Sequence, residues 1–167
     1  MSDNQQSGFG VKEYFGIKIL KDGTWLHEGQ PIKRMSLVKL LSTVLKRDNE
    51  GFYWLQTPVE KGQIEVEDVP FVAVELKSQG TGINRQISFR TNIDDWVTVD
   101  FHHALSVHSN TKTSEIFPYV MIRDGLEAKL LRPVYYHLVD LCEENPEKQG
   151  EMGVWSCGQF YPIGNVS

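Results

Sequence analysis

The chain has 167 residues, of which 40% are hydrophobic and 23% charged, a composition that is ordinary for globular proteins and excludes wholesale disorder. Its 22 acidic residues outnumber its 17 lysines and arginines, and the net charge of −5 argues against a protein that coats a polynucleotide by neutralising phosphates. A small anionic ligand held by a few arginines is compatible with this charge.

The N-terminal sequence Met1 to Gly8 has neither the basic nor the apolar region of a secretory signal, and we predict a polar tail over residues 1–10. No apolar run approaches the roughly 18 residues that a membrane span requires. Cys142 and Cys157 form no CxxC pair, and two thiols in a chain of this size are most simply two reduced cysteines. These features predict a cytoplasmic protein.

The next part of the chain, residues 11–66, has the pattern of a small α+β unit. Asp22-Gly23 is a pair favoured in tight hairpin turns, where both positions need positive φ. Leucines then recur at helical spacing, and Lys46 and Arg47 suit the C-terminus of that helix. Apolar or alternating runs predict four strands: 17–20, 24–27, 52–56 and 64–67.

The remaining part of the chain is rich in short strands bounded by turn residues. The predicted strands are 71–76, 86–92, 96–99, 105–107, 118–123, 153–156 and 159–162. Turn signals at this spacing favour an antiparallel meander. A helix is predicted to begin at Pro133, because proline suits a first helical turn, and to stop at Asn145-Pro146.

An internal repeat joins the two parts. Three landmarks recur in the same order at an offset of 101 or 102 residues: Lys21-Asp22-Gly23 with Arg123-Asp124-Gly125, Pro31 with Pro133, and Trp54 with Trp155. Each unit runs strand, Asp-Gly turn, seven residues, proline, amphipathic helix and tryptophan-bearing strand. Residues 126–131 have a helix-forming composition. The repeat aligns them with a hairpin arm at residues 24–30, and we therefore predict a strand there.

These patterns predict an α+β protein built from a duplicated unit of antiparallel strands plus one helix. We place the N-terminal unit at residues 11–66 and the C-terminal domain at residues 67–167. The latter carries about seven short strands followed by a long helix, which is the element order of a pleckstrin-homology-like barrel. Such an analogy predicts a fold and not a function.

Six strings along residues 15–164 are distinctive: Asp22-Gly-Thr-Trp25, Thr57-Pro-Val-Glu60, Val66-Glu-Asp-Val-Pro-Phe71, Arg90-Thr-Asn92, Gly125-Leu-Glu-Ala128 and Trp155-Ser-Cys-Gly158. In these strings the chain resembles a bacterial family catalogued as domain of unknown function 1285. The resemblance implies a duplicated α+β fold whose C-terminal half is similar to pleckstrin-homology domains. It also implies a nucleotide-type ligand at the domain interface and a role in signalling, and it implies no activity.

The sequence contains no constellation typical of an enzyme. His102-His103 and His108 form a cluster without an acidic or thiol partner at metal-ligand spacing. Ser156-Cys157-Gly158 is not a GxSxG elbow and has no assigned base. Glycine-rich phosphate loops are also missing. We therefore predict a non-enzymatic protein without a metal or cofactor.

A set of polar side chains suits ligand binding better than catalysis. Guanidinium groups suit phosphate or carboxylate, and an aromatic face suits a base. The candidate ligand-binding residues are Arg90, Asn92, Arg123, Arg132, Thr57, Glu60 and Trp155. The structural alternative is that the arginines form salt bridges with three acidic residues, Glu67, Asp68 and Asp124.

We predict a cytoplasmic sensor or binding module that holds a small anionic, nucleotide-type ligand between its two domains and acts in signalling. The alternative is a protein-interaction module that uses a sheet edge or a helix groove of the C-terminal domain. An unrecognised hydrolase is disfavoured, because no nucleophile and base can be paired.

Overall fold

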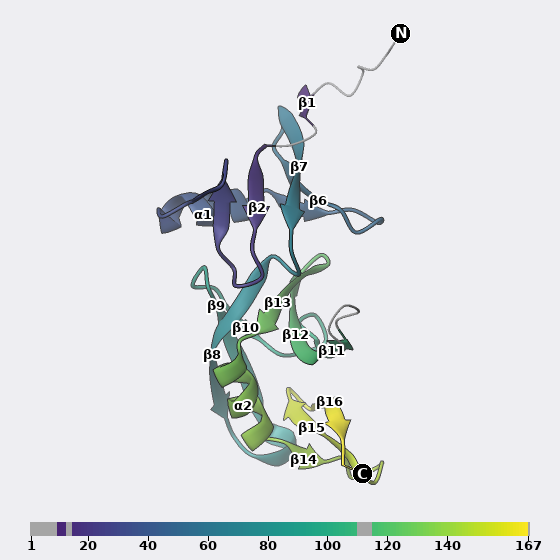
Figure 1. Ribbon diagram of the computed structural model, residues 1–167. Helices are drawn as coiled ribbons and strands as arrows, with labels where there is room; N and C mark the ends of the chain where they lie inside the picture. Colours follow the sequence, from purple (N-terminus) through teal and green to yellow (C-terminus); the bar gives the residue numbers. More distant parts are fainter. Residues whose placement is uncertain (1–9, 13–14, 110–114, 167) are drawn as a thin grey trace. The chain divides into compact units, whose positions relative to one another are not determined.

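A computed structural model describes residues 10–12, 15–109 and 115–166, which divide into two compact units, Met1–Pro70 and Phe71–Ser167 (Figure 1). The boundary predicted from the sequence, between residues 66 and 67, lies four residues earlier than the observed one. The predicted tail lies outside the described residues apart from Gly10. Neither α-helix in the described ranges has the length and hydropathy to cross a membrane.

The first unit is one sheet with a helix. Its elements are β1 (Gly10–Lys12), β2 (Ile17–Ile19), β3 (Trp25–His27), β4 (Gln30–Pro31), α1 (Met35–Thr43), β5 (Leu45–Arg47), β6 (Tyr53–Gln56) and β7 (Glu60–Val66). The strand order is β4-β3-β2-β7-β6-β5, with β1 paired to β7. Two antiparallel three-stranded meanders therefore meet at a parallel pair, β2 with β7.

The Asp22-Gly23 hairpin is confirmed, because it joins the antiparallel strands β2 and β3. Its geometry differs from the prediction, since Gly23 has a φ of 92° while Asp22 keeps a negative φ. The Asp22 carboxylate instead accepts the Thr24 backbone N–H at 2.9 Å. The turn is therefore stabilised by the hydrogen bond to the Asp22 side chain together with the positive φ of Gly23.

The predicted end of the first helix was wrong. The helix stops at Thr43, and Lys46 and Arg47 belong to β5, which pairs with β6. Leu45 lies opposite Leu55 and is 1% exposed. Strand pairing and burial of this leucine outweigh the helical spacing of the local sequence.

The second unit holds a six-stranded sheet, a helix and a separate three-stranded sheet. Its elements are β8 (Phe71–Gln79), the 3₁₀ helix η2 (Gly82–Asn84), β9 (Gln86–Thr91), β10 (Trp96–Thr98), β11 (Leu105–Ser109), β12 (Ile116–Arg123), β13 (Leu126–Leu130), α2 (Arg132–Asp140), β14 (Glu143–Glu144), β15 (Glu151–Ser156) and β16 (Gln159–Asn165). The large sheet has the order β10-β9-β8-β13-β12-β11, and the small one β14-β15-β16. The predicted strand at residues 126–131 is confirmed as β13.

The large sheet repeats the arrangement of the first unit, with two antiparallel meanders joined at the parallel pair of β8 and β13. One of its faces is core, because Ile87 and Phe89 are fully buried on β9. Helix α2 packs along β8 and buries Val134 and Leu138 (Figure 1). The parallel pair corrects the prediction of a purely antiparallel meander.

The duplicated order of elements is confirmed, with differences in detail. A hairpin, a helix and a three-stranded meander occur both as β2 to β7 and as β12 to β16. Pro31 lies in β4, four residues before α1 begins, whereas Pro133 is in the first turn of α2. The second helix has nine residues and is followed by three strands, so it is neither long nor the last element of the unit.

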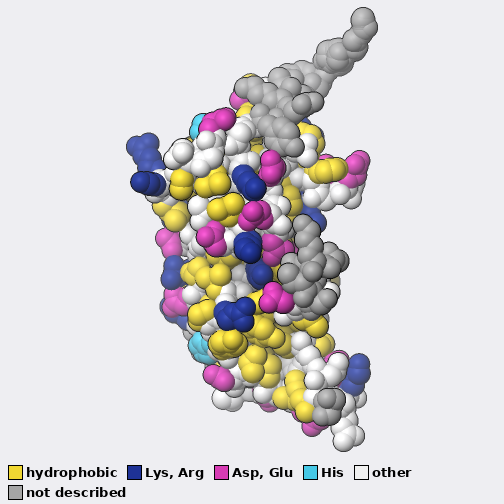
Figure 2. Space-filling view, viewed as in Figure 1, with side chains coloured by type: hydrophobic (Ala, Val, Ile, Leu, Met, Phe, Trp, Pro, Cys, Tyr) yellow, Lys and Arg dark blue, Asp and Glu magenta, His cyan; other side chains and the backbone are white. Residues whose placement is uncertain are grey.

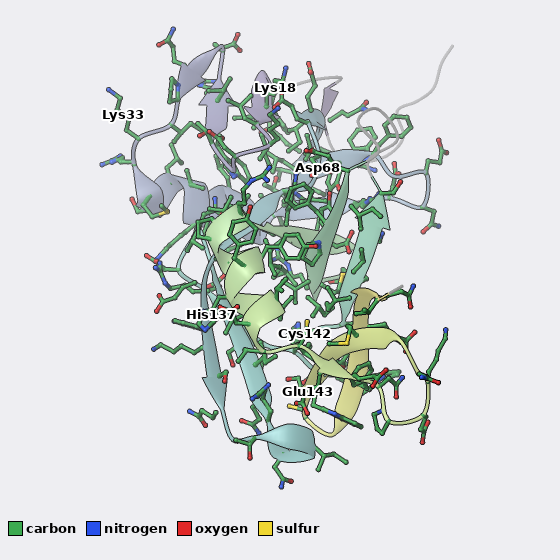
Figure 3. All side chains as sticks on the ribbon, turned by 60° about the horizontal axis from the view of Figure 1, so that its bottom comes forward. Lys18, Lys33, Asp68, His137, Cys142 and Glu143 are labelled. Atoms are coloured by element: carbon green, nitrogen blue, oxygen red, sulfur yellow. The ribbon has the colours of Figure 1, made fainter. Side chains whose placement is uncertain are left out.

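Both cysteines are free thiols. Cys142 is half-buried just after α2, next to the start of β14 at Glu143 (Figure 3), and burial raises the pKa of its thiol. Cys157 is exposed in the turn between β15 and β16. Its φ of 51° and the φ of 78° at Gly158 give the turn two successive left-handed residues, as tight hairpin turns require.

The Asp48 carboxylate links Trp54 on β6 to the turn between β5 and β6. The Trp54 indole N–H donates to Asp48 Oδ2 at 2.8 Å, and Asp48 Oδ1 accepts the backbone N–H groups of Glu50 and Phe52. These hydrogen bonds, the one from Trp54 foremost, lower the pKa of Asp48. Because they favour the charged carboxylate in the folded state, protonation in acid removes stability.

We therefore expect an acid-sensitive contribution from Asp48. Its pKa is lower when folded than when unfolded, so the stabilisation is complete above the usual aspartate pKa of about 3.9 and is lost as the pH falls through the folded value. The melting temperature of wild type should fall more between pH 6 and pH 3 than that of Asp48→Asn. Equal falls in the two proteins would contradict this assignment.

Candidate functional site

The first unit contains a pocket between α1 and the sheet, with a volume of about 360 Å³. The residues that line it are Phe15, Ile17, His27, Ile32, Leu37, Leu41, Val44, Leu55, Thr57 and Glu60. Seven of these ten side chains are aliphatic or aromatic hydrocarbons, so the pocket has an apolar body. Its size is at the lower end of the range for small-molecule sites.

Strand pairing explains why these side chains meet. Ile17 on β2 is directly opposite His27 on β3, so both side chains are on the same face of the hairpin. Phe15 is able to lie against β7 because residue 62 is glycine, and a β-carbon there would overlap the Phe15 ring. The helix contributes Leu37 and Leu41, which are four residues apart and therefore on one helix face.

One end of the pocket is polar and is built by the turn between β6 and β7. The Thr57 hydroxyl accepts the backbone N–H of Glu60 at 3.0 Å, and the Thr57 N–H donates to the Glu60 carbonyl at 2.8 Å. Thr57 thus has a structural task, which is to fix the position of Glu60 at the start of β7. The ionisable groups in the lining are Glu60 and His27, and the described lining holds no lysine or arginine.

The seven candidate residues from the sequence are divided between the two units. Thr57 and Glu60 come together at the pocket of the first unit. The other five belong to the second unit. The salt-bridge alternative applies to Arg90, with partners other than those predicted: its guanidinium bonds Glu75 and Asp94, each at 2.8 Å. These hydrogen bonds, led by the one that Arg90 donates to Glu75, raise the pKa of Arg90.

Asn92 also makes contacts within the sheet, because its side-chain oxygen accepts the Val72 N–H at 3.1 Å and its own N–H donates to the Val72 carbonyl. Arg123 ends β12 beside the Asp124 turn. Trp155 meets Phe160 edge-on at 5.3 Å, a contact between paired strands. These contacts give the side chains of Asn92 and Trp155 a structural role.

Arg132 is the first residue of α2, and its guanidinium carbon lies 5.7 Å from the centre of the Phe117 ring. The pKa of Arg132 is raised, mainly by a hydrogen bond with Tyr136. Lys129 approaches the same Phe117 ring to 4.1 Å. Cation–π contacts of this kind stabilise a surface without requiring a ligand.

The histidines have partners that the sequence did not suggest. His108 Nε2 lies 3.1 Å from Glu127 Oε2 and 3.2 Å from the Ser106 hydroxyl. Both partners use the same ring nitrogen, whereas a serine–histidine–acid relay needs one partner on each nitrogen. His103 contacts the Met121 carbonyl instead. No group of three metal-binding side chains occurs in the described ranges.

Basic and acidic side chains are interspersed on the described part of the face in Figure 2. Acidic side chains therefore accompany the basic ones on this face, in line with the net charge of −5.

Comparison with known proteins identifies the family. Residues 11–69 match the model described as "Domain of unknown function (DUF1285), N-terminal domain", and residues 70–163 match "Protein of unknown function (DUF1285), C-terminal domain". No functionally curated protein matches the chain. The chain therefore belongs to the DUF1285 family.

Two solved structures of DUF1285 family proteins are similar to the chain. The protein from Silicibacter pomeroyi DSS-3 is 34% identical, with 99% of this chain and 91% of that chain covered and a TM-score of 0.86. The protein from Shewanella baltica OS155 is 25% identical, with 75% and 91% covered and a TM-score of 0.58.

Proposed function

We propose that this member of the DUF1285 family is a non-enzymatic binding protein whose first unit takes up a small, mainly apolar ligand between α1 and the sheet. The observation that carries the proposal is a contrast between the two helices. Helix α2 buries Leu138 completely and packs along β8, whereas α1 leaves a space of about 360 Å³ beside its leucines.

An apolar ligand would shield the apolar side chains around that space from water. Leu37 remains 37% exposed and Leu41 and Val44 are half-buried, although all three face the pocket. Removing such side chains from water is favourable by about 25 cal/mol for each Å² of apolar surface. A ligand with a hydrocarbon body would supply the contacts that these residues lack.

The proposal changes the ligand class and the place that the sequence suggested. The predicted ligand was anionic and lay between the two domains, with Arg90 among its contacts. The lining of the pocket in the first unit includes the acidic residue Glu60 and holds no described lysine or arginine, which disfavours an anion there. A sensor role in the cytoplasm remains part of the proposal, supported by the two free thiols.

The test is a pocket-filling substitution with a matched control on the same helix. N-phenyl-1-naphthylamine is an apolar dye that fluoresces on entering such sites. Leu37→Trp should fill the pocket and weaken dye binding about tenfold or more. Leu40→Trp should leave binding within about twofold, because Leu40 is 63% exposed and outside the lining. Equal binding by both variants, with folding checked by circular dichroism, would contradict the proposal.

The second candidate is protein interaction through a sheet edge of the second unit. Strand β10 is the last in its sheet order, and Trp96 on it is 41% exposed below the Lys77 ammonium. A partner strand on this edge would slow hydrogen exchange of β10 amides in cell extract relative to buffer. Unchanged exchange there would exclude this use of the edge.

A further inference from the structure

We infer that Phe15 limits the size of the ligand that the pocket of the first unit accepts, and that Gly62 is the seat of its ring. This inference rests on the proposed function and deepens it by naming the ligand class, a hydrocarbon chain of medium length, and the residue that selects it. Phe15 supplies the phenyl ring among the described lining residues of the pocket.

Strand register places the Phe15 ring on the pocket side of the sheet. Gly62 on β7 lies directly opposite Leu55 on β6, so a side chain at residue 62 would project from the same face as that of Leu55, which lines the pocket. A β-carbon at residue 62 would overlap the Cε2 and Cδ2 atoms of the Phe15 ring. The ring therefore takes the place of a side chain at residue 62, on the face that carries the pocket.

Gly62 is unfavourable for the strand unless its missing side chain has a use. It is buried and pairs with β6 on one side and β1 on the other, and glycine in the interior of a strand lowers stability. Phe15 belongs to no strand, so strand alternation does not position its ring. The close approach to Gly62 does so instead, and it fixes this wall of the pocket.

The volume of the pocket indicates the size of ligand that fits beside this wall. A dry cavity of about 150 Å³ accommodates benzene, and the pocket of about 360 Å³ is somewhat more than twice as large. The side chain of Phe15 is itself about the size of benzene. Its removal should therefore enlarge the pocket substantially and admit longer chains.

The test compares linear alkan-1-ols from hexanol to dodecanol by displacement of N-phenyl-1-naphthylamine. Wild-type affinity should rise about fourfold with each added methylene group and then level off where the chain outgrows the pocket. In Phe15→Ala the levelling-off should move to chains about two or more carbons longer. Phe52→Ala is the matched control, because Phe52 is in the same unit, 48% exposed and outside the lining, and it should keep the wild-type limit.

A second measurement tests the seat of the ring. Gly62→Ala should lower the melting temperature of wild type, because its methyl group displaces the Phe15 ring. In the Phe15→Ala background the same substitution should leave the melting temperature unchanged or raise it, because alanine suits a strand better than glycine once the ring is gone. Equal shifts in the two backgrounds would mean that the ring is not seated on Gly62.

The outcomes separate this inference from the proposed function. If the dye and the alcohols bind but wild type and Phe15→Ala level off at the same chain length, or neither levels off, Phe15 does not set the limit while the apolar pocket stands. Phe15→Leu, a smaller truncation, gives the same comparison if circular dichroism shows Phe15→Ala to be unfolded. If neither the dye nor any alcohol binds wild type, both the inference and the proposed function are overturned.

Discussion

Replacing Leu138 by alanine is expected to lower the free energy of unfolding by about 2–5 kcal/mol, which is the usual effect of truncating a fully buried leucine. Leu138 is 0% exposed, and α2 holds it against the sheet alongside β8. The loss includes the transfer of the removed methyl groups and the cavity that they leave, since neighbouring elements relax only partly.

The adjacent residue supplies the control. Val139 is on the same helix but is 47% exposed, so Val139→Ala should change the free energy of unfolding by no more than about 0.5 kcal/mol. Urea unfolding of both variants gives the comparison. A loss below about 1 kcal/mol for Leu138→Ala would mean that α2 does not anchor the sheet of the second unit.

Local signals explain why much of the fold could be predicted. Asp-Gly pairs select hairpin turns, and both lie between antiparallel strands. The repeat was more informative than composition at residues 126–131, where helix-forming residues make up β13. The alternation on β9 also located the buried face, because Ile87 and Phe89 have side chains on the same side.

Non-local contacts explain what could not be predicted. The parallel pairs β2 with β7 and β8 with β13 join segments far apart in sequence, and no short motif encodes them. The sequence also does not show which sheet a meander joins. Strand β7 pairs with β2 in a shared sheet, whereas β14, β15 and β16 form a sheet of their own.

The candidate site was predicted only in part. Thr57 and Glu60 were among the candidates. The leucines of α1 were recognised only by their helical spacing, because their role as a pocket wall depends on where the sheet lies. Arg90 bonds Glu75 across a register shift in the β8–β9 pair, which no spacing rule would have located. The partners of arginines are set by tertiary structure.

Ser156 shows how one buried hydroxyl joins two sheets of the second unit. Its hydroxyl accepts the Ile87 N–H at 3.0 Å and donates to the Val99 carbonyl at 2.7 Å, while the Val99 N–H donates directly to the Ile87 carbonyl at 2.8 Å. The hydroxyl is therefore inserted at the place where a second ladder hydrogen bond between Ile87 and Val99 would otherwise form. Ser156 itself is on β15 and is 0% exposed.

Ser156→Ala is expected to lower the free energy of unfolding by about 1–3 kcal/mol, because it leaves a buried N–H and a buried carbonyl without their partner. Ser88→Ala is the matched control. Ser88 is on β9, and its hydroxyl lies 2.9 Å from the Thr98 hydroxyl on β10. That variant should lose less than about 1 kcal/mol. The Ile87 amide should also exchange its hydrogen faster in Ser156→Ala. If the two variants are equally stable and Ile87 exchange is unchanged, β9 and β10 must close their own ladder, and the hydroxyl is not the link between the sheets.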